Sequence, residues 1–322
     1  MTDHLSPETR VDPATPPKAV AVAVALLIVY VVWGSTYLGV RIVVAEMPPL
    51  TAMGLRFSGA GLLLAGLLAA ARGIKRLRLT PRQVLGTAFL GLWLPFLGNG
   101  MVSIAISHGA TSGLAALLNS IAPLVIVLFR VLERDIPRKS TVAGVVLGLV
   151  GLSILLLPRD GDSGTPVGPA LLIVVAATCW AVGSYLQPRL WIPKDPFVVA
   201  VWEMIWGGAM MLTVGAALGE RLSTGYSNDA WAALAYLVVF GAGIGYTAYI
   251  WLIANAPISL VTTYAYVNPL IAVFLGWLIL EEAITIPMAV GGGVVLSGIA
   301  LVVTAESRRS TTAATHLTDP VT

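Results

Sequence analysis

The sequence has little charge and almost no cysteine or histidine. Of its 322 residues, 11% are charged and 57% are hydrophobic, whereas a soluble domain carries about 25% charged residues. Cys179 is the only cysteine, so no disulfide bond can form within the chain. The three histidines, His4, His108 and His316, are too few for a His/Cys metal centre. A soluble globular domain, a disulfide scaffold and a His/Cys metalloprotein are therefore excluded.

The sequence also lacks the features that common soluble partners require. It contains no GxxxxGKS or GxxxxGKT motif, so ATP hydrolysis is not expected. Its formal net charge is only +3, so nucleic acid is not expected as a partner. We expect no cofactor and no metal. The expected partners are a small-molecule substrate and the lipid bilayer, with a homodimer left open.

What the sequence does contain is a series of long apolar runs. A helix needs about 20 apolar residues to cross the hydrocarbon core of a bilayer. Polar, proline and glycine positions divide the chain into ten such runs, at 20–44, 50–71, 83–106, 111–132, 141–157, 167–187, 197–218, 230–253, 258–280 and 284–304. The loops between them are too short for a folded domain. The tails 1–18 and 305–322 are rich in threonine, proline and charge and are predicted to be disordered.

The basic residues predict the orientation of these spans, because cytoplasmic loops retain lysine and arginine. If the amino terminus lies inside, 14 of the 19 fall in cytoplasmic segments: Arg10, Lys18, Arg72, Lys75, Arg76, Arg78, Arg82, Arg134, Arg138, Lys139, Arg189, Lys194, Arg308 and Arg309. Only Arg159 and Arg221 fall on the opposite side. This bias predicts an all-α integral membrane protein with both termini cytoplasmic, located in the cell membrane.

The two halves of the chain repeat each other. A shift of 147 residues places Trp33 on Trp180 and Pro49 on Pro196 without a gap, and it places Arg56 on Glu203. Each half, 19–158 and 166–304, would then hold five spans. Because five is odd, the second half enters the membrane from the opposite side, which predicts two inverted five-helix repeats.

Two charged residues lie deep inside predicted spans, namely Arg56 and Glu203. An ionisable side chain at mid-membrane costs at least about 2.5–3.5 kcal/mol, so it normally faces a bundle interior or a water-filled cavity. Both are therefore candidate substrate-binding residues. The alternative is a purely structural role, either as a salt bridge between the halves or through separate pairing with backbone carbonyls.

Aromatic and polar residues inside other spans extend the candidate site. Trp and Tyr far from the membrane interface are outside their usual belt, and aromatic walls with a few polar anchors suit small amphipathic solutes. The candidates in the two halves are Trp33, Ser35, Thr36, Tyr37, Asn99 and Asn119, then Trp180, Ser184, Trp206, Tyr264 and Asn268. The alternative for each is ordinary helix packing.

Two prolines fall near the middle of predicted spans, Pro123 in the fourth and Pro269 in the ninth. Each removes a backbone donor and frees the carbonyl four residues earlier, so we expect both helices to kink and to border one cavity. A static kink satisfied by a neighbouring hydroxyl is the alternative. The motifs GVVLG (144–148) and GVVLS (293–297) predict close helix packing, within the chain or in a dimer.

The chain resembles the EamA family of the drug/metabolite transporter superfamily, and within it the YedA-type metabolite exporters. The resemblance rests on WGSTYLGVR (33–41), PPLTAMGLRF (48–57), GNGM (98–101), GLAALLNSIAPL (113–124), CWAVGSYL (179–186) and TTYAYVNPL (262–270). It implies ten helices in two inverted repeats, inner-membrane residence and export of small metabolites or drugs. It supplies no catalytic motif.

Three classes of function remain to be compared. The leading hypothesis is a secondary transporter that exports small organic solutes, amino-acid-like or drug-like, by alternating access. A membrane scaffold or receptor would need no internal cavity. An intramembrane enzyme would need paired carboxylates, a metal cluster or a nucleophile beside a base, and a single deep carboxylate argues against it.

Overall fold

The computed structural model describes residues 19–134, 136–156, 167–223, 225–256, 258–261 and 263–318. In these residues the regular elements are all helices. The first half contains α1 (Ala19–Val44), α2 (Pro49–Arg72), η1 (Ile74–Leu77), α3 (Pro81–Gly91), η2 (Leu92–Gly100), α4 (Met101–Ser107), α5 (Ser112–Asn119), α6 (Ala122–Leu132) and α7 (Lys139–Leu156). The second contains α8 (Val167–Leu186), η3 (Gln187–Arg189), α9 (Pro196–Ala217), α10 (Asn228–Tyr236), η4 (Leu237–Ile244), α11 (Gly245–Asn255), α12 (Ile258–Val261), α13 (Tyr264–Leu280) and α14 (Ile286–Thr318).

Nine helical segments in the described residues are long and apolar enough to cross a membrane. They coincide with nine of the ten predicted spans. The remaining one, 258–280, is divided into α12 and α13, and α13 has 17 residues, at the lower end of the length that can span a bilayer.

Local sequence explains where several helices begin. Proline, which lacks the N–H that a first turn leaves unpaired, opens α2, α3 and α9. Thr80 and Gln83 form a capping box at the start of α3. The side chains of Thr111, Asp195 and Ser227 accept hydrogen bonds from the first turns of α5, α9 and α10.

The two halves are packed into each other. Helix α1 packs on α10, η4, α11 and α13 of the second half, and α8 packs on η2, α4, α5 and α6 of the first. Helix α2 lies along α9. The largest cluster of buried apolar side chains accordingly draws on both halves, including Met53, Leu118, Met211 and Leu237. Neither half has a complete core of its own.

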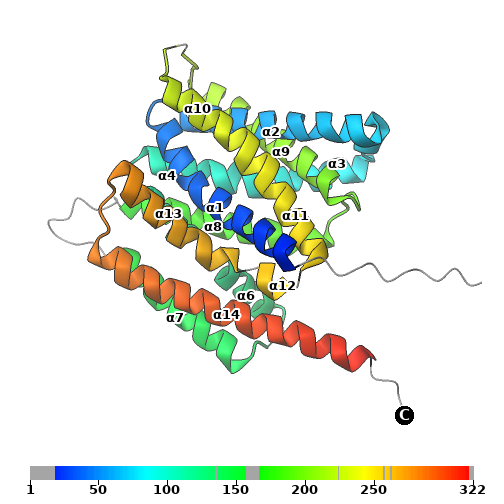
Figure 1. The fold of residues 1–322 in the computed structure, drawn as a ribbon, viewed down its shortest axis with the longest axis vertical. Coiled ribbons are helices and arrows are strands. Elements are labelled where there is room, and N and C mark those ends of the chain that lie inside the picture. Colours follow the sequence, from blue (N-terminus) through cyan, green and yellow to red (C-terminus); the bar gives the residue numbers. More distant parts are fainter. Residues whose placement is uncertain are drawn as a thin grey trace, which may run out of the picture.

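Helices α7 and α14 form a separate pair at one edge of the bundle (Figure 1). A Cβ on Gly144 would lie 2.8 Å from the carbonyl oxygen of Gly298, and one on Gly291 would lie 3.1 Å from that of Gly151. The small residues that meet on α14 are thus Gly291 and Gly298 rather than the predicted Gly293 and Ser297, because Gly293 has nothing within 4 Å. The motif GVVLG (144–148) therefore packs within the chain.

The carboxyl-terminal segment differs from expectation. The tail 305–322 was predicted to be disordered, but α14 continues as helix to Thr318. Between 305 and 318 the chain has alanine, glutamate and arginine, which favour helix, and no proline or glycine. The other predicted tail, 1–18, lies outside the described residues.

Candidate functional site

Around α1, the structure brings together eight of the thirteen predicted site residues, which we call the α1 group: Trp33, Ser35, Thr36, Tyr37, Arg56, Asn119, Tyr264 and Asn268. The amide nitrogen of Asn119 donates to the Tyr37 hydroxyl at 2.8 Å, and the rings of Trp33 and Tyr264 lie 5.3 Å apart. These contacts join α1 to α5 and α13, which come from different halves of the chain.

Arg56 lies on α2 with only 6% of its surface exposed. Its guanidinium is 4.9 Å from the centre of the Phe57 ring. A Cβ on Gly241 would lie 3.4 Å from Nη2, so the guanidinium reaches η4. Its Nε has no hydrogen-bond partner among the described residues.

Helix η4 was not anticipated from the sequence. It is a π-helix, and the indole nitrogen of Trp33 donates to its Gly241 carbonyl at 3.1 Å. The hydroxyls of Ser35 and Tyr236 lie 2.6 Å apart at its start. Helix η2 in the first half is also a π-helix, with Pro95 inside it. Because π-helices are rare and frequently mark functional sites, these paired segments are features that the sequence analysis missed.

Around η2, α8 and α9 lie the other five predicted residues, which we call the α8 group: Asn99, Trp180, Ser184, Glu203 and Trp206. The Asn99 amide donates to the Leu94 carbonyl at 3.4 Å, and Trp180 lies beside Gly98. Ser184 is half-buried on α8. Its members also come from both halves of the chain, η2 from the first and α8 and α9 from the second.

Glu203 is 7% exposed on α9, and its nearest polar neighbour is a residue that the sequence analysis missed. The hydroxyl of Tyr246, on α11, lies 3.5 Å from Oε1 of Glu203 and donates to it. The ring centres of Tyr246 and Tyr249 lie 6.3 Å apart. The ring centre of Tyr249 in turn lies 5.0 Å from that of Trp33. A line of aromatic rings therefore connects Glu203 with the α1 group.

Arg56 and Glu203 are both among the described residues, and they form no ion pair with each other. Three buried side-chain atoms in the described residues lack a hydrogen-bond partner, namely Arg56 Nε, Trp206 Nε1 and Asn268 Oδ1. All three belong to residues predicted for the site. Leaving a buried polar atom unpaired costs about 1–3 kcal/mol, so a polar solute bound here would satisfy groups that the protein leaves unsatisfied.

The two prolines differ in their effect. Beside Pro123 the fourth span is interrupted, because α5 ends at Asn119 and α6 begins at Ala122. The interruption of the ninth predicted span comes earlier than Pro269, since α12 ends at Val261 and α13 begins at Tyr264. Pro269 lies inside α13, five residues after its first residue, where it removes the hydrogen bond to the carbonyl of Ala265 without ending the helix.

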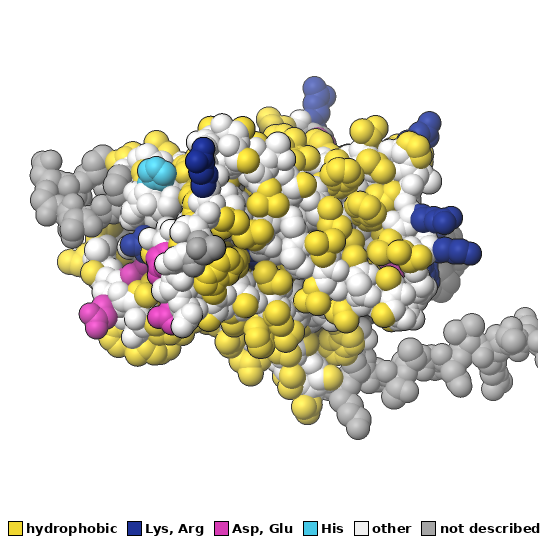
Figure 2. Space-filling model, turned by 90° about the horizontal axis from the view of Figure 1, so that it is seen from above, with side chains coloured by type: hydrophobic (Ala, Val, Ile, Leu, Met, Phe, Trp, Pro, Cys, Tyr) yellow, Lys and Arg dark blue, Asp and Glu magenta, His cyan; other side chains and the backbone are white. Residues whose placement is uncertain are grey.

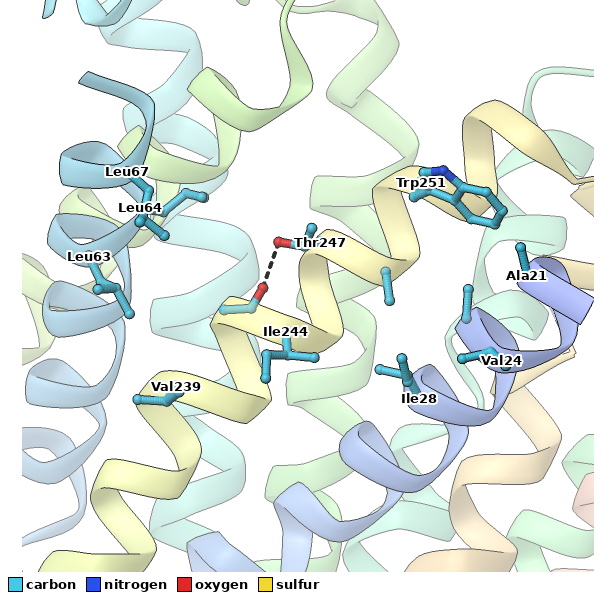
Figure 3. Close-up of a pocket in the computed structure, with 13 residues that line it drawn as sticks. Ala21, Val24, Ile28, Leu63, Leu64, Leu67, Val239, Ile244, Thr247 and Trp251 are labelled. Atoms are coloured by element: carbon cyan, nitrogen blue, oxygen red, sulfur yellow. Dashed lines mark hydrogen bonds between the residues drawn. The ribbon is translucent and has the colours of Figure 1, made fainter. Parts of the chain in front are cut away.

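A groove of about 690 Å³ lies on the outside of the bundle, between α1, α2 and α11 (Figure 3). Its labelled lining residues are almost all aliphatic, and the hydroxyl of Thr247 is already bonded to the Gly243 carbonyl at 2.7 Å. The groove contains neither Arg56 nor Glu203. It offers surface for hydrocarbon and no anchor for a polar solute.

The long apolar helices define a multi-pass membrane protein, and two charged side chains, Arg56 and Glu203, are buried within it. The comparison with known families is more specific, because a sequence model of the EamA-like transporter family matches residues 20–157 and again 168–304. The chain belongs to the EamA-like transporter family and is a multi-pass protein of the inner membrane.

Two similar proteins are also named as transporters. The chain is 39% identical over 253 residues to the uncharacterized inner membrane transporter YedA of Escherichia coli strain K12, which covers 78% of this chain and 80% of the relative. It is 25% identical over 286 residues to the uncharacterized transporter sll0355 of Synechocystis, covering 81% and 83%. One crystal structure aligns with a TM-score of 0.61 at 22% identity, over 90% of this chain and 99% of the other, and supports the fold alone.

Proposed function

We propose that the chain is a secondary transporter that exports small organic solutes bearing both a carboxylate and an amine. The solute binds between the α1 group and the α8 group, with Arg56 as the anchor for the carboxylate and Glu203 as the anchor for the amine. Its two halves act as inverted five-helix repeats that rock about this site, and both termini lie in the cytoplasm.

The observation that carries the proposal is the burial of these two opposite charges without pairing. They occupy equivalent positions 147 residues apart, one on α2 and one on α9. A charge buried without a partner is unfavourable by several kcal/mol, and a zwitterionic solute would bring the missing partner to each. The matching contacts of the halves, α2 with α9 and α7 with α14, support the rocking of repeats.

The test compares Arg56→Gln, Glu203→Gln and the control Arg76→Gln, whose side chain is exposed in η1. Efflux of amino acids and of their amine-only and carboxylate-only analogues is measured in cells beside folded protein in detergent. We expect Arg56→Gln to lower export of carboxylates and Glu203→Gln that of amines by about tenfold or more, since bonds to charged groups contribute about 1.5–3 kcal/mol. Arg76→Gln should export normally.

Two outcomes contradict the proposal. If a folded single variant exports every solute at the wild-type rate, that residue does not bind the solute. If both single variants misfold while the double variant Arg56→Gln/Glu203→Gln folds, the charges serve as a structural pair.

A further inference from the structure

Three glutamates at one end of the bundle each bind the start of a helix in the other half of the chain. We call this end, with its loop residues 45–48, 108–111, 218–223, 225–227 and 281–285, the carboxylate end. Figure 2 shows acidic side chains gathered there, with lysine and arginine side chains at the opposite end. The three are Glu46, Glu220 and Glu282, and together they tie α1 to α10, α9 to α2 and α13 to α5.

Each tie consists of several short hydrogen bonds. Glu46 accepts from the backbone N–H of Ser227 at 2.7 Å and from its hydroxyl at 2.5 Å. Glu220 accepts from the N–H and the hydroxyl of Thr51, both at 2.7 Å. Bonds from carboxylates to backbone N–H groups at a helix start are charge-assisted, and the helix dipole strengthens them.

The tie of Glu282 follows the same pattern. It accepts from the N–H of Ser112 at 2.9 Å and from its hydroxyl at 2.7 Å. Arg41 of α1 lies 3.9 Å from the same carboxylate and donates to the Ile106 carbonyl at 3.0 Å. Three helices of the bundle, α1, α5 and α13, therefore meet at Glu282.

Glu220 and Glu282 are held in place by the same local device. Each follows a residue with positive φ that ends its helix, Gly219 (85°) and Glu281 (55°). A glycine in the last turn leaves room for each carboxylate. A Cβ on Gly215 would lie 2.8 Å from Oε2 of Glu220, and a Cβ on Gly276 would lie 2.5 Å from Oε2 of Glu282.

The six tied helices are also the helices that surround the candidate site. Helices α1, α2, α5 and α13 carry residues of the α1 group, α9 carries Glu203, and α10 carries Tyr236, which contacts Ser35. A solute that leaves the site toward the carboxylate end must pass between these helices. The ties hold their ends together in the structure.

We propose that the ties of Glu46, Glu220 and Glu282 form the gate that closes the carboxylate end, and that this end opens only when they release. This inference rests on the proposed transport function. The predicted orientation places the gate on the outer side of the membrane, so the structure represents a state closed to the outside. The alternative is that the carboxylates cap their helices in every state and never release.

The test measures access to the site and needs no substrate. In a Cys179→Ser background, Thr36→Cys introduces one thiol into the α1 group, and a membrane-impermeant maleimide is applied to the carboxylate end in oriented vesicles. The triple variant Glu46→Gln/Glu220→Gln/Glu282→Gln is compared with Glu133→Gln, a control whose carboxylate is exposed at the opposite end. We expect labelling to rise roughly twofold to thirtyfold for each lost cap, and not in the control.

Two results overturn the proposal. One is a folded triple variant that labels at the wild-type rate, and the other is an equal rise in Glu133→Gln. Labelling does not depend on transport. If the chain exports no tested solute, the proposed function is wrong, but the labelling result still tests the gate.

A cross-link tests the gate if the triple variant fails to fold. A Cβ on Gly215 would lie 3.3 Å from the Cβ of Leu50, close to the separation of about 3.5–4.5 Å in disulfides. Oxidation of Leu50→Cys/Gly215→Cys would lock α2 to α9 at this end. We expect oxidation to stop transport of any exported solute. A reductant should restore the rate of the reduced double variant, in which the new Cβ at 215 already crowds the Glu220 carboxylate at 2.8 Å. Unchanged transport by the oxidised protein would show that these ends need not part.

Discussion

The two ends of the bundle are held together by different chemistry. At the carboxylate end, side chains bind backbone N–H groups of helix first turns, whose positions the helices fix. At the opposite end, the contacts between described residues of the two halves include two ion pairs, Arg72 with Asp195 at 3.2 Å and Arg189 with Glu133 at 2.8 Å. The indole nitrogen of Trp202 also donates to the Leu77 carbonyl there, at 2.9 Å. Arg189 and Glu133 are both about half exposed, and exposed ion pairs contribute about 0–1 kcal/mol. The difference teaches that the two ends close by different means. Glu220 and Glu282 hold partly buried helix starts, whereas Arg189 and Glu133 pair in contact with solvent.

The largest effect on this contrast should come from Gly276→Ala. Its new Cβ would occupy the space of the Glu282 carboxylate and of the Ser112 hydroxyl, at 2.5 and 2.6 Å. We expect the tie to α5 to break, with a loss of about 2–4 kcal/mol in the free energy of unfolding from overpacking and unpaired groups. Thermal unfolding of wild type and variant in detergent measures this loss of stability.

The matched control is Gly293→Ala on α14, where a Cβ would meet nothing within 4 Å. Glycine inside a helix is less favourable than alanine by about 0.5–1 kcal/mol, so this variant should be as stable as wild type or slightly more so. If both variants unfold at the same temperature, the space beside Glu282 does not matter.

A smaller effect should appear as a pH dependence at Glu46. The hydroxyl and the N–H of Ser227 hold the pKa of Glu46 below its ordinary value of 4.5, because they bond the charged form. The tie therefore stabilises the fold fully above pH 4.5 and loses its contribution as the pH falls through the folded-state pKa. Unfolding temperatures measured across this range should fall less steeply for Glu46→Gln than for wild type. Identical profiles would mean that the tie is not coupled to folding.

The smallest effect should come from Glu133→Gln at the opposite end. The variant removes an exposed ion pair to Arg189, and we expect a change in unfolding free energy within about 0.5 kcal/mol. A loss as large as that of Gly276→Ala would erase the contrast between the ends.

Much of the fold was predictable because a bilayer imposes helices on long apolar runs. The predicted span 50–71 corresponds to Pro49–Arg72, and 197–218 corresponds to Pro196–Ala217. The burial of Arg56 and Glu203 was also predictable, since charges are costly within a span. Their role in binding a solute stays a prediction.

Other features depend on contacts that no local pattern encodes. Glu46 and Glu282 looked like ordinary acids at span ends, because their partners lie 181 and 170 residues away in the chain. The contact of Tyr246 with Glu203 arises from the packing of α11. The π-helix η4 that precedes α11 was likewise not predicted. Pro269 was expected to kink its helix, which stays a prediction, and the interruption between Val261 and Tyr264 was not expected.

The ties at the carboxylate end also impose an order on biosynthesis. Thr51 and Ser112 find their carboxylates only after a further 169 and 170 residues have been made. At about 5–20 residues per second, the ribosome needs roughly ten to thirty seconds for that length. During this interval α2 and α5 are in place without these partners. The first half is therefore a nascent intermediate whose maturation waits for the second.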